Sequence, residues 1–434
     1  MTAVAPPSSI ASNHPPAFRD LPFMGVIRVN NEAAKVGYTM GDPSWSNLGQ
    51  GQPEVGEMEG APARFGELKI DPADHAYGPV EGIPELRDAV AAHYNRLYRA
   101  GKTSVYTREN VAIAPGGRAA LTRLGAALAP CKLGYFTPDY TAYEDLLTAF
   151  GTIRPVHIEL KASEGFRIAP KTLAARVSKD GINALLISNP CNPTGVAICG
   201  EELRAWVEMA RARGTTLLMD EFYSHFAYAA DGSAMAGIGG VSAAPFVEDV
   251  NADPVLLIDG LTKCFRYPGW RVGWVVGPRE IIQKCTAAGS FLDGGPSRPI
   301  QRAAVEVLKP ARAGQELAAV RRGFAIKHKM TVEALQALGV RFPAAGKGSV
   351  GSGTFYVFGD VSSLPAPMNT GEGFMREAFK HRVLTVPGEF FDVNPGRARE
   401  GPSPLGSFVR FSFGPPKENL AAGLARLGEM VGRR

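Results

Sequence analysis

Lys263 is the residue in this chain best placed for covalent chemistry, because an apolar run carries it into a turn of small and aromatic residues. The run Leu256 to Ile258 precedes it, and Arg271 follows eight positions later. Burial and a nearby guanidinium both favour the neutral amine of a lysine, and a neutral amine forms Schiff bases with carbonyl compounds. An isolated lysine in a loop is more often a surface residue, so this interpretation depends on other segments.

Three other segments carry groups that would work with such an amine. They are Ser188 to Gly195 (SNPCNPTG), Met219 to Tyr223 (MDEFY) and Phe408 to Gly414 (FVRFSFG). Together with Lys263 they resemble the fold-type I, class I/II pyridoxal phosphate-dependent aminotransferases, from about Asn47 to the C-terminus. The NPTG segment is a weak signal by itself, whereas the joint pattern is specific. The resemblance implies that Lys263 forms a Schiff base with pyridoxal 5'-phosphate.

Asp220 ends a predicted strand that begins at Thr215. A buried carboxylate needs a cationic partner, and a protonated pyridine nitrogen would be one that also lets the cofactor ring accept electrons. The alternative role for Asp220 is an N-cap after a strand. By resemblance, Tyr223 and Asn192 contact the phenolic oxygen of the cofactor. The resemblance also implies that Tyr140 stacks on the cofactor ring, with a core aromatic as the alternative.

Two glycines in the segment Ala114 to Leu121 separate a predicted strand from a predicted helix. Glycines let backbone amides approach an anion, and a helix N-terminus favours negative charge, although a plain strand-to-helix turn has the same pattern. The resemblance implies that Gly116, Gly117 and Arg118 contact the cofactor phosphate. It also implies a bidentate pairing of Arg271 with the phosphate.

Two positions depart from the family pattern. Arg118 stands where small hydroxyl or amide side chains are common, and it either pairs with the phosphate or points into solvent. Gly260 stands where the family often carries a hydroxyl, so Thr262 or Arg118 would replace that contact. Tyr77 resembles a tyrosine that crosses a dimer interface to the partner's phosphate, which implies a homodimer with shared active sites. A turn tyrosine before a helix is the alternative.

On the substrate side, Arg410 lies in an alternating segment from Phe408 to Phe413. It resembles the arginine that holds the substrate α-carboxylate through a bidentate salt bridge, the alternative being a solvent-facing strand residue. Gly51 and Asn192 match family positions that meet the substrate. The resemblance implies transfer of an amino group between an L-amino acid and a 2-oxo acid, with Lys263 as general base.

Other activities fit the same residues. A lyase or an oxidative enzyme acting on an amino acid would use the same site. A regulator that uses this fold as a ligand sensor would need a DNA-binding module, for which the first 45 residues are too short and too proline-rich. Asp293 is either a solvated loop carboxylate or a partner for a cationic substrate side chain.

Short apolar strands alternate with amphipathic helices through most of the chain. Strands are predicted at 110–114, 133–136, 184–188, 215–220, 254–259 and 271–276, and helices at 84–100, 118–128, 142–150 and 200–213. This alternation predicts an α/β fold whose large domain has a mostly parallel sheet covered by helices, with ligands at the carboxyl ends of the strands. A helical stretch at 299–338, broken near Pro310, leads to a smaller α+β domain with strands at 353–361, 383–387 and 407–414 and helices at 371–381 and from about 416.

The predicted domain organisation has four parts. They are a flexible N-terminal arm at 1–45, a segment at 46–75 that packs with the small domain, a large cofactor-binding domain at 76–325, and a small C-terminal domain at 326–434. The 434 residues are too many for one ordinary core.

Composition narrows the partners and the location. The net charge of +5 comes from 47 basic and 42 acidic residues without a basic cluster, so nucleic acid is not an expected partner. The sequence has no apolar run of membrane-spanning length and no secretory pattern at its start. Its five cysteines and seven histidines show no metal-ligand spacing. We therefore expect no metal, no membrane partner and a cytoplasmic protein with reduced thiols.

Overall fold

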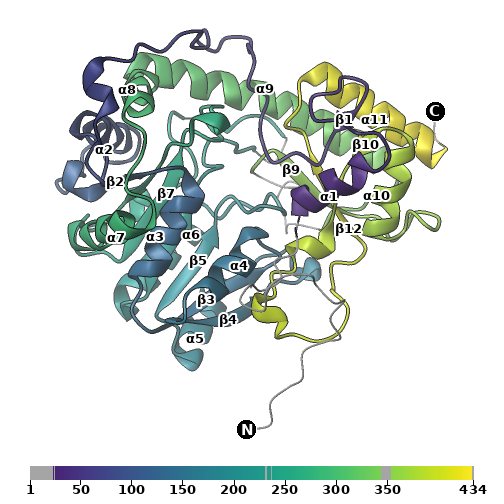
Figure 1. Ribbon diagram of the computed structural model, residues 1–434. Coiled ribbons are helices and arrows are strands. Elements are labelled where there is room, and N and C mark those ends of the chain that lie inside the picture. Colours follow the sequence, from purple (N-terminus) through teal and green to yellow (C-terminus); the bar gives the residue numbers. More distant parts are fainter. Residues whose placement is uncertain (1–22, 24, 230–231, 236, 344–352, 433–434) are drawn as a thin grey trace, which may run out of the picture.

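The computed structural model describes residues 23, 25–229, 232–235, 237–343 and 353–432. Its largest element is a seven-stranded sheet (Figure 1). The strand order is β2 (Val111–Ala114), β8 (Gly273–Val276), β7 (Val255–Gly260), β6 (Thr216–Asp220), β5 (Ala184–Ser188), β3 (Cys131–Thr137) and β4 (Ile153–Glu159). Only β8 opposes the common direction, because it is antiparallel to both β2 and β7.

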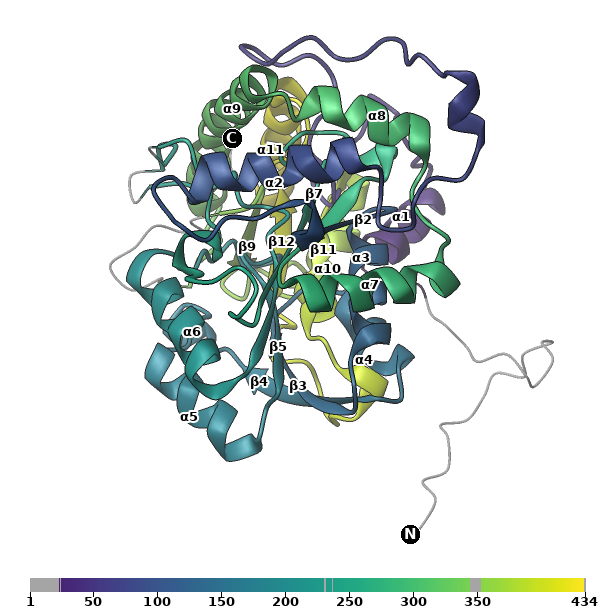
Figure 2. The ribbon, with the colours of Figure 1, turned by 90° about the vertical axis from the view of Figure 1, so that its left-hand side faces the viewer.

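Helices cover both faces of this sheet, as the right-handed crossover rule requires. The chain moves from β2 to β4 in one direction along the sheet and returns from β4 to β6 in the other. The crossover helices α3 (Gly117–Ala127) and α4 (Ala142–Ala149) therefore lie on one face with α7 (Arg279–Leu292), while α5 (Pro170–Asp180) and α6 (Gly200–Arg213) lie on the other (Figure 2). Strands β5 and β7 are buried along their whole length, which explains their continuous apolar runs.

A second unit contains the C-terminal part of the chain. It has an antiparallel sheet in the order β11 (Val386–Pro387), β12 (Phe408–Ser412) and β9 (Tyr356–Asp360), with α10 (Gly371–Lys380) and α11 (Lys417–Val431) beside it. The short strand β1 (Ser46–Asn47) pairs in parallel with β10 (Val383–Leu384). The N-terminal segment is thereby attached to this second unit (Figure 1).

Three further helices flank these sheets. They are α2 (Pro84–Tyr98), which begins at a proline, α8 (Arg298–Val307) and α9 (Pro310–Ala337). The helix α9 continues without a break across the predicted domain boundary at residue 325, so it connects the two units. The four-part domain division itself stays a prediction. None of the helices in the described ranges has the length and hydropathy needed to cross a bilayer.

The predicted flexible arm is wrong for residues 25–34, which form the helix α1 (Gly25–Ala34). Its Val29 and Ala33 are buried in a cluster with Leu384 and Phe390. A short helix of this composition is not stable alone, so its packing against the second unit accounts for it. Residues 1–22 of the predicted arm lie outside the described residues.

The α/β prediction is confirmed, and β5 and α6 have the predicted bounds. The sequence analysis did not predict the strand β4 or the helices α5 and α7. The strand predicted at 383–387 is two strands, because the chain leaves the β1 pairing after Leu384 and enters the β12 pairing at Val386. The strand predicted from 271 begins at Gly273, since Arg271 has a left-handed backbone (φ 54°).

Candidate functional site

The carboxyl ends of the central strands open into a cavity of about 900 Å³ between the two units. Ten of the twelve predicted site residues line it. They are Gly51, Gly117, Arg118, Tyr140, Asn192, Asp220, Tyr223, Lys263, Arg271 and Arg410. The structure thus brings together positions that span most of the sequence.

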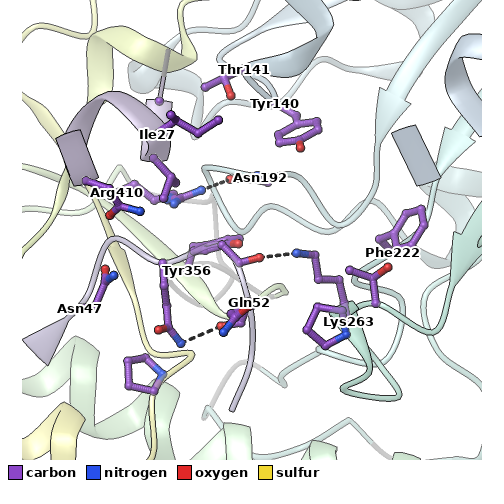
Figure 3. Close-up of a pocket in the computed structure, with 18 of the residues that line it drawn as sticks. Ile27, Asn47, Gln52, Tyr140, Thr141, Asn192, Phe222, Lys263, Tyr356 and Arg410 are labelled. Atoms are coloured by element: carbon purple, nitrogen blue, oxygen red, sulfur yellow. Dashed lines mark hydrogen bonds between the residues drawn. The ribbon is translucent and has the colours of Figure 1, made fainter. Parts of the chain in front are cut away.

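Lys263 projects into this cavity from the turn that follows β7 (Figure 3). Its Nζ donates a hydrogen bond to the carbonyl oxygen of Gly51 and lies 5.9 Å from the ring centroid of Tyr223. Burial lowers the pKa of Lys263 to about 7, and the nearby cations Arg410 and Arg118 act in the same direction. A large fraction of this amine is therefore neutral at neutral pH and can act as a nucleophile or a base.

Asp220 ends β6 and is almost fully buried at the cavity wall. Its Oδ2 accepts a hydrogen bond of 2.8 Å from the hydroxyl of Tyr143. Burial raises the pKa of Asp220 to about 6, while the Tyr143 hydrogen bond lowers it, so the carboxylate is mostly ionised at neutral pH. Within the described part of the chain no ion pair involves Asp220, and a cation in the cavity would compensate its charge.

Gly116 and Gly117 form a close-packed turn at the start of α3. A Cβ on Gly116, whose φ is 91°, would lie 2.4 Å from Nη2 of Arg271, and a Cβ on Gly117 would lie 2.3 Å from the ring of Phe222. Gly116 is not itself a lining residue, but it packs directly against the guanidinium of Arg271. The first amides of α3 and this guanidinium offer donors for an anion.

Gly260 stands where the family often carries a hydroxyl residue, and the reason is steric. A Cβ at this position would lie 2.4 Å from the carbonyl oxygen of Val272, so there is no room for a side chain. Thr262 lies nearby in the cavity lining, and its Oγ1 is buried with no hydrogen-bond partner among the residues described. That hydroxyl is available to an anion held by Arg271.

Arg118 is an exposed residue at the edge of the cavity lining. Its Nε and Nη2 donate to the hydroxyl of Tyr140 at 3.1 and 2.9 Å, and its pairing with the phosphate stays a prediction. The contact holds the two side chains together at the cavity wall.

Arg410 occupies the central strand of the antiparallel sheet and is only 2% exposed, so the alternative of a solvent-facing residue is wrong. Its Nη1 donates to Oδ1 of Asn192 at 3.0 Å (Figure 3), and its Nη2 donates to the carbonyl oxygen of Gly49 at 2.7 Å. The buried Nε has no partner within the described ranges. A fixed guanidinium with an unused donor suits a carboxylate.

Tyr143 and Tyr356 are site residues that the sequence analysis missed. Tyr143 lies three positions after Tyr140, at the start of α4. Tyr356 lines the cavity from β9, and its hydroxyl lies 3.2 Å from that of Tyr223. The helical spacing from Tyr140 was the only sequence signal for Tyr143.

Asp293 and Tyr77 lie outside the cavity. Asp293 forms a bidentate ion pair with Arg123, whose side chain is fully buried, with distances of 2.8 and 2.5 Å. Asp293 is paired and does not line the cavity, so the structure does not support its meeting a cationic substrate. The residue is exposed, as expected of a loop carboxylate, but its charge is paired with Arg123. Tyr77 is 98% exposed and does not reach the site of its own chain.

The groups in the cavity fit pyridoxal phosphate together with an amino acid. They comprise a lysine that loses its proton near pH 7, an anion cradle and, as far as the described residues go, a buried carboxylate without an ion-pair partner and a buried arginine with an unused donor. No group of three or more residues suited to holding a metal ion occurs in the described portion.

Known proteins are similar to this chain in sequence and architecture. Residues 43–427 match the model of the family described as aminotransferase class I and II. The chain is 28% identical to the aspartate/prephenate aminotransferase of Thermus thermophilus over 362 residues, covering 82% of this chain and 83% of that protein. It is 25% identical to the aspartate aminotransferase of Sulfurisphaera tokodaii over 398 residues, with 89% of each chain covered. A solved aminotransferase from Mycobacterium tuberculosis superposes with a TM-score of 0.74 at 26% identity, covering 95% of this chain and 97% of that one.

Proposed function

The chain belongs to the class I and II aminotransferases, and on that premise we propose how its cavity performs the reaction of the family. The protein is a pyridoxal phosphate-dependent enzyme that moves an amino group between an amino acid and a 2-oxo acid. The observation that carries it is the amine of Lys263 beside the buried carboxylate of Asp220, in one cavity with Arg410.

Each part of the cofactor has a matching residue in the cavity. Lys263 would hold its aldehyde carbon and Asp220 its ring nitrogen, with Tyr223 and Asn192 at the phenolic oxygen. Arg271 and the Gly116–Gly117 turn would hold the phosphate, helped by the unpartnered hydroxyl of Thr262. When bound, pyridoxal phosphate supplies an electron sink for the negative charge that develops at the substrate α-carbon.

The side chains of the protein position the substrate and move its proton. Arg410 binds the α-carboxylate with two parallel donors, which fixes the α-carbon relative to Lys263. Lys263 then takes the α-proton and later returns it, a role that suits a base whose pKa is about 7. Asp220, ionised at this pH, keeps a proton on the ring nitrogen beside it.

We infer that an acidic amino acid is among the substrates. Relatives of this chain bear the names aspartate aminotransferase and aspartate/prephenate aminotransferase. A second carboxylate needs a second cation, and the guanidinium of Arg118 is a candidate because it lines the cavity and, among the described residues, its hydrogen bonds go to the hydroxyl of Tyr140 and not to a carboxylate. In this arrangement the backbone amide of Arg118, and not its guanidinium, faces the phosphate.

We propose a homodimer in which Tyr77 reaches the phosphate of the partner's site. Its nearly complete exposure in a single chain and its distance from its own cavity support this role. A cytoplasmic location is consistent with five free cysteines. Light scattering of the purified enzyme should show a dimer, and Tyr77→Phe should weaken cofactor retention. A monomer that is fully active at all concentrations would contradict the shared site.

The decisive experiment compares the wild type with Lys263→Ala in the presence of cofactor. Borohydride reduction should leave the cofactor attached to the wild type after denaturation and removal of free cofactor, and the unreduced wild type should convert an amino acid with a 2-oxo acid acceptor, whereas the variant should show neither. A panel of amino donors that includes aspartate and an aromatic amino acid then defines the substrate class. Ammonia release without an acceptor would indicate a lyase, and oxygen consumption would indicate an oxidative enzyme.

A further inference from the structure

Tyr356 occupies a central position in the cavity wall that none of the proposed roles explains. It comes from β9 in the second unit, and in Figure 3 it lies between Arg410 and Lys263. It is fully buried relative to the outer surface, yet its hydroxyl approaches the cavity next to Gly51. A buried phenol needs a hydrogen-bond partner, and the partner here is Tyr223.

Two contacts of Tyr356 reach two different functional groups. Its hydroxyl oxygen lies 3.2 Å from the hydroxyl oxygen of Tyr223. The guanidinium carbon of Arg410 lies 4.1 Å from the centroid of its ring, which is cation–π geometry. A single side chain therefore touches both the group proposed for the substrate carboxylate and the group proposed for the cofactor.

We propose that Tyr356 is a positioning residue that orients Arg410 through its ring and Tyr223 through its hydroxyl. This inference rests on the proposed function, since it assigns work at the same site. In a pair of hydroxyls only one can donate to the other. When Tyr356 donates, the proton of Tyr223 is free to point into the cavity and to bond the phenolic oxygen of the cofactor.

The surroundings favour this direction of donation. Burial raises the pKa of Tyr356 while the cation over its ring lowers it, so the phenol keeps its proton at neutral pH and is a stronger donor than an isolated buried phenol. Burial also keeps Tyr223 protonated. A hydroxyl that accepts one hydrogen bond donates the next one more strongly, so Tyr356 reinforces the bond from Tyr223 to the cofactor.

Tyr356→Phe separates the two contacts because it removes the hydroxyl and keeps the ring. The proton that titrates in the visible spectrum of the cofactor-bound enzyme is held more weakly when the phenolic oxygen is stabilised as an anion. Loss of one hydrogen bond in the relay should raise the pH midpoint of that spectrum by about 0.7. The KM for the amino acid should change less than about twofold, because the ring under Arg410 remains.

Tyr356→Leu removes both contacts and should show both effects, with the same shift of the spectral midpoint and a KM raised about threefold to tenfold. Tyr228→Phe is the matched control. It deletes another buried hydroxyl, which lies outside the cavity and donates to the carbonyl oxygen of Thr354 at 2.8 Å, so it should change neither the spectral midpoint nor the KM.

Site-specific 3-fluorotyrosine at position 356 keeps the shape of the side chain and makes its hydroxyl a stronger donor. The pH midpoint of the cofactor spectrum should therefore fall, and this test remains possible if Tyr356→Phe does not fold.

The outcomes distinguish the inference from the proposed function. A normal spectrum whose midpoint is the same in wild type, Tyr356→Phe and the fluorotyrosine enzyme would overturn the role of Tyr356 and leave the function intact. Equal shifts in Tyr356→Phe and Tyr228→Phe would also overturn it, because a general loss of packing would then explain both. A wild-type enzyme without any visible spectrum after addition of cofactor would refute the proposed function itself.

Discussion

Replacing Arg410 with leucine should remove recognition of the α-carboxylate while leaving the chemistry at the cofactor possible. Each charge-assisted hydrogen bond to the carboxylate contributes about 1.5–3 kcal/mol. A carboxylate would take Nε, which has no partner among the described residues, and one of the two Nη atoms, which already bond to Asn192 and to the carbonyl oxygen of Gly49 at 3.0 and 2.7 Å. The net gain is therefore near the low end, about 3–4 kcal/mol for two bonds, and kcat/KM should fall about 10²- to 10³-fold.

The assay compares an amino acid with the corresponding amine, which has no carboxylate. The leucine variant leaves two buried acceptors without donors, so some general damage is expected. That damage affects both substrates, whereas the loss of carboxylate binding affects only the amino acid. The ratio of the two kcat/KM values should therefore fall by the full 10²- to 10³-fold, and Arg410→Lys should show a smaller fall because the charge remains and the fork is lost.

Arg341→Leu is the control for this comparison, since it makes the same change at an exposed arginine that pairs with Asp360 at the end of β9. It should leave the ratio unchanged. If Arg410→Leu lowers kcat/KM for the amine and the amino acid by the same factor, then Arg410 holds the cavity together and does not bind the carboxylate.

Three further predictions follow from buried charges. Because the folded pKa of Lys263 is about 7, against 10.5 ordinarily, reductive methylation of this amine in cofactor-free protein should rise with pH around a midpoint near 7. The unfolded chain then binds more protons between pH 7 and 10.5, so the free energy of unfolding should increase over this range, and Lys263→Met should abolish the increase. Glu316→Gln leaves the fully buried guanidinium of Arg266 without its charge partner, so the free energy of unfolding measured in urea should fall by about 3–5 kcal/mol. Glu306→Gln, in an exposed ion pair, is the control and should change this free energy by less than about 0.5 kcal/mol. Equal losses in the two variants would contradict the idea that burial makes the Arg266 pair important. Asp293→Asn should cost about 2 kcal/mol of stability and leave the kcat/KM ratio of lysine to aspartate unchanged, and a changed ratio would return Asp293 to the substrate site.

The sequence was informative where function depends on the end of a strand. Asp220 and the turn before Lys263 follow apolar runs long enough to be recognised as buried strands. Parallel strands end at the same edge of a sheet, so residues after different strands were expected to meet. The cavity lining confirms this placement for both residues.

The sequence does not predict which side chains pair in the folded protein, because the partners are distant in sequence and carry no local pattern. Tyr143 and Asp220 are 77 positions apart, and Tyr223 and Tyr356 are 133 positions apart. Nothing near Asp293 indicates that its partner lies 170 positions earlier. The edge strand β4 was missed for a related reason, since its exposed residues include charges and a proline and so lack the apolar run of a central strand.

The pairing of Gly49 with Arg410 joins positions 361 apart in the chain, and Ser46 contacts Asn419 across 373 positions. Synthesis on the ribosome proceeds from the N-terminus, so the carbonyl oxygen of Gly49 cannot meet Arg410 until β12 has emerged. Lys263 therefore stays an ordinary amine from its own synthesis until β12 has emerged and the cavity can form around it. Loading with vitamin B6 is expected to be a late event in the maturation of the enzyme, after β12 has paired with β9 and β11.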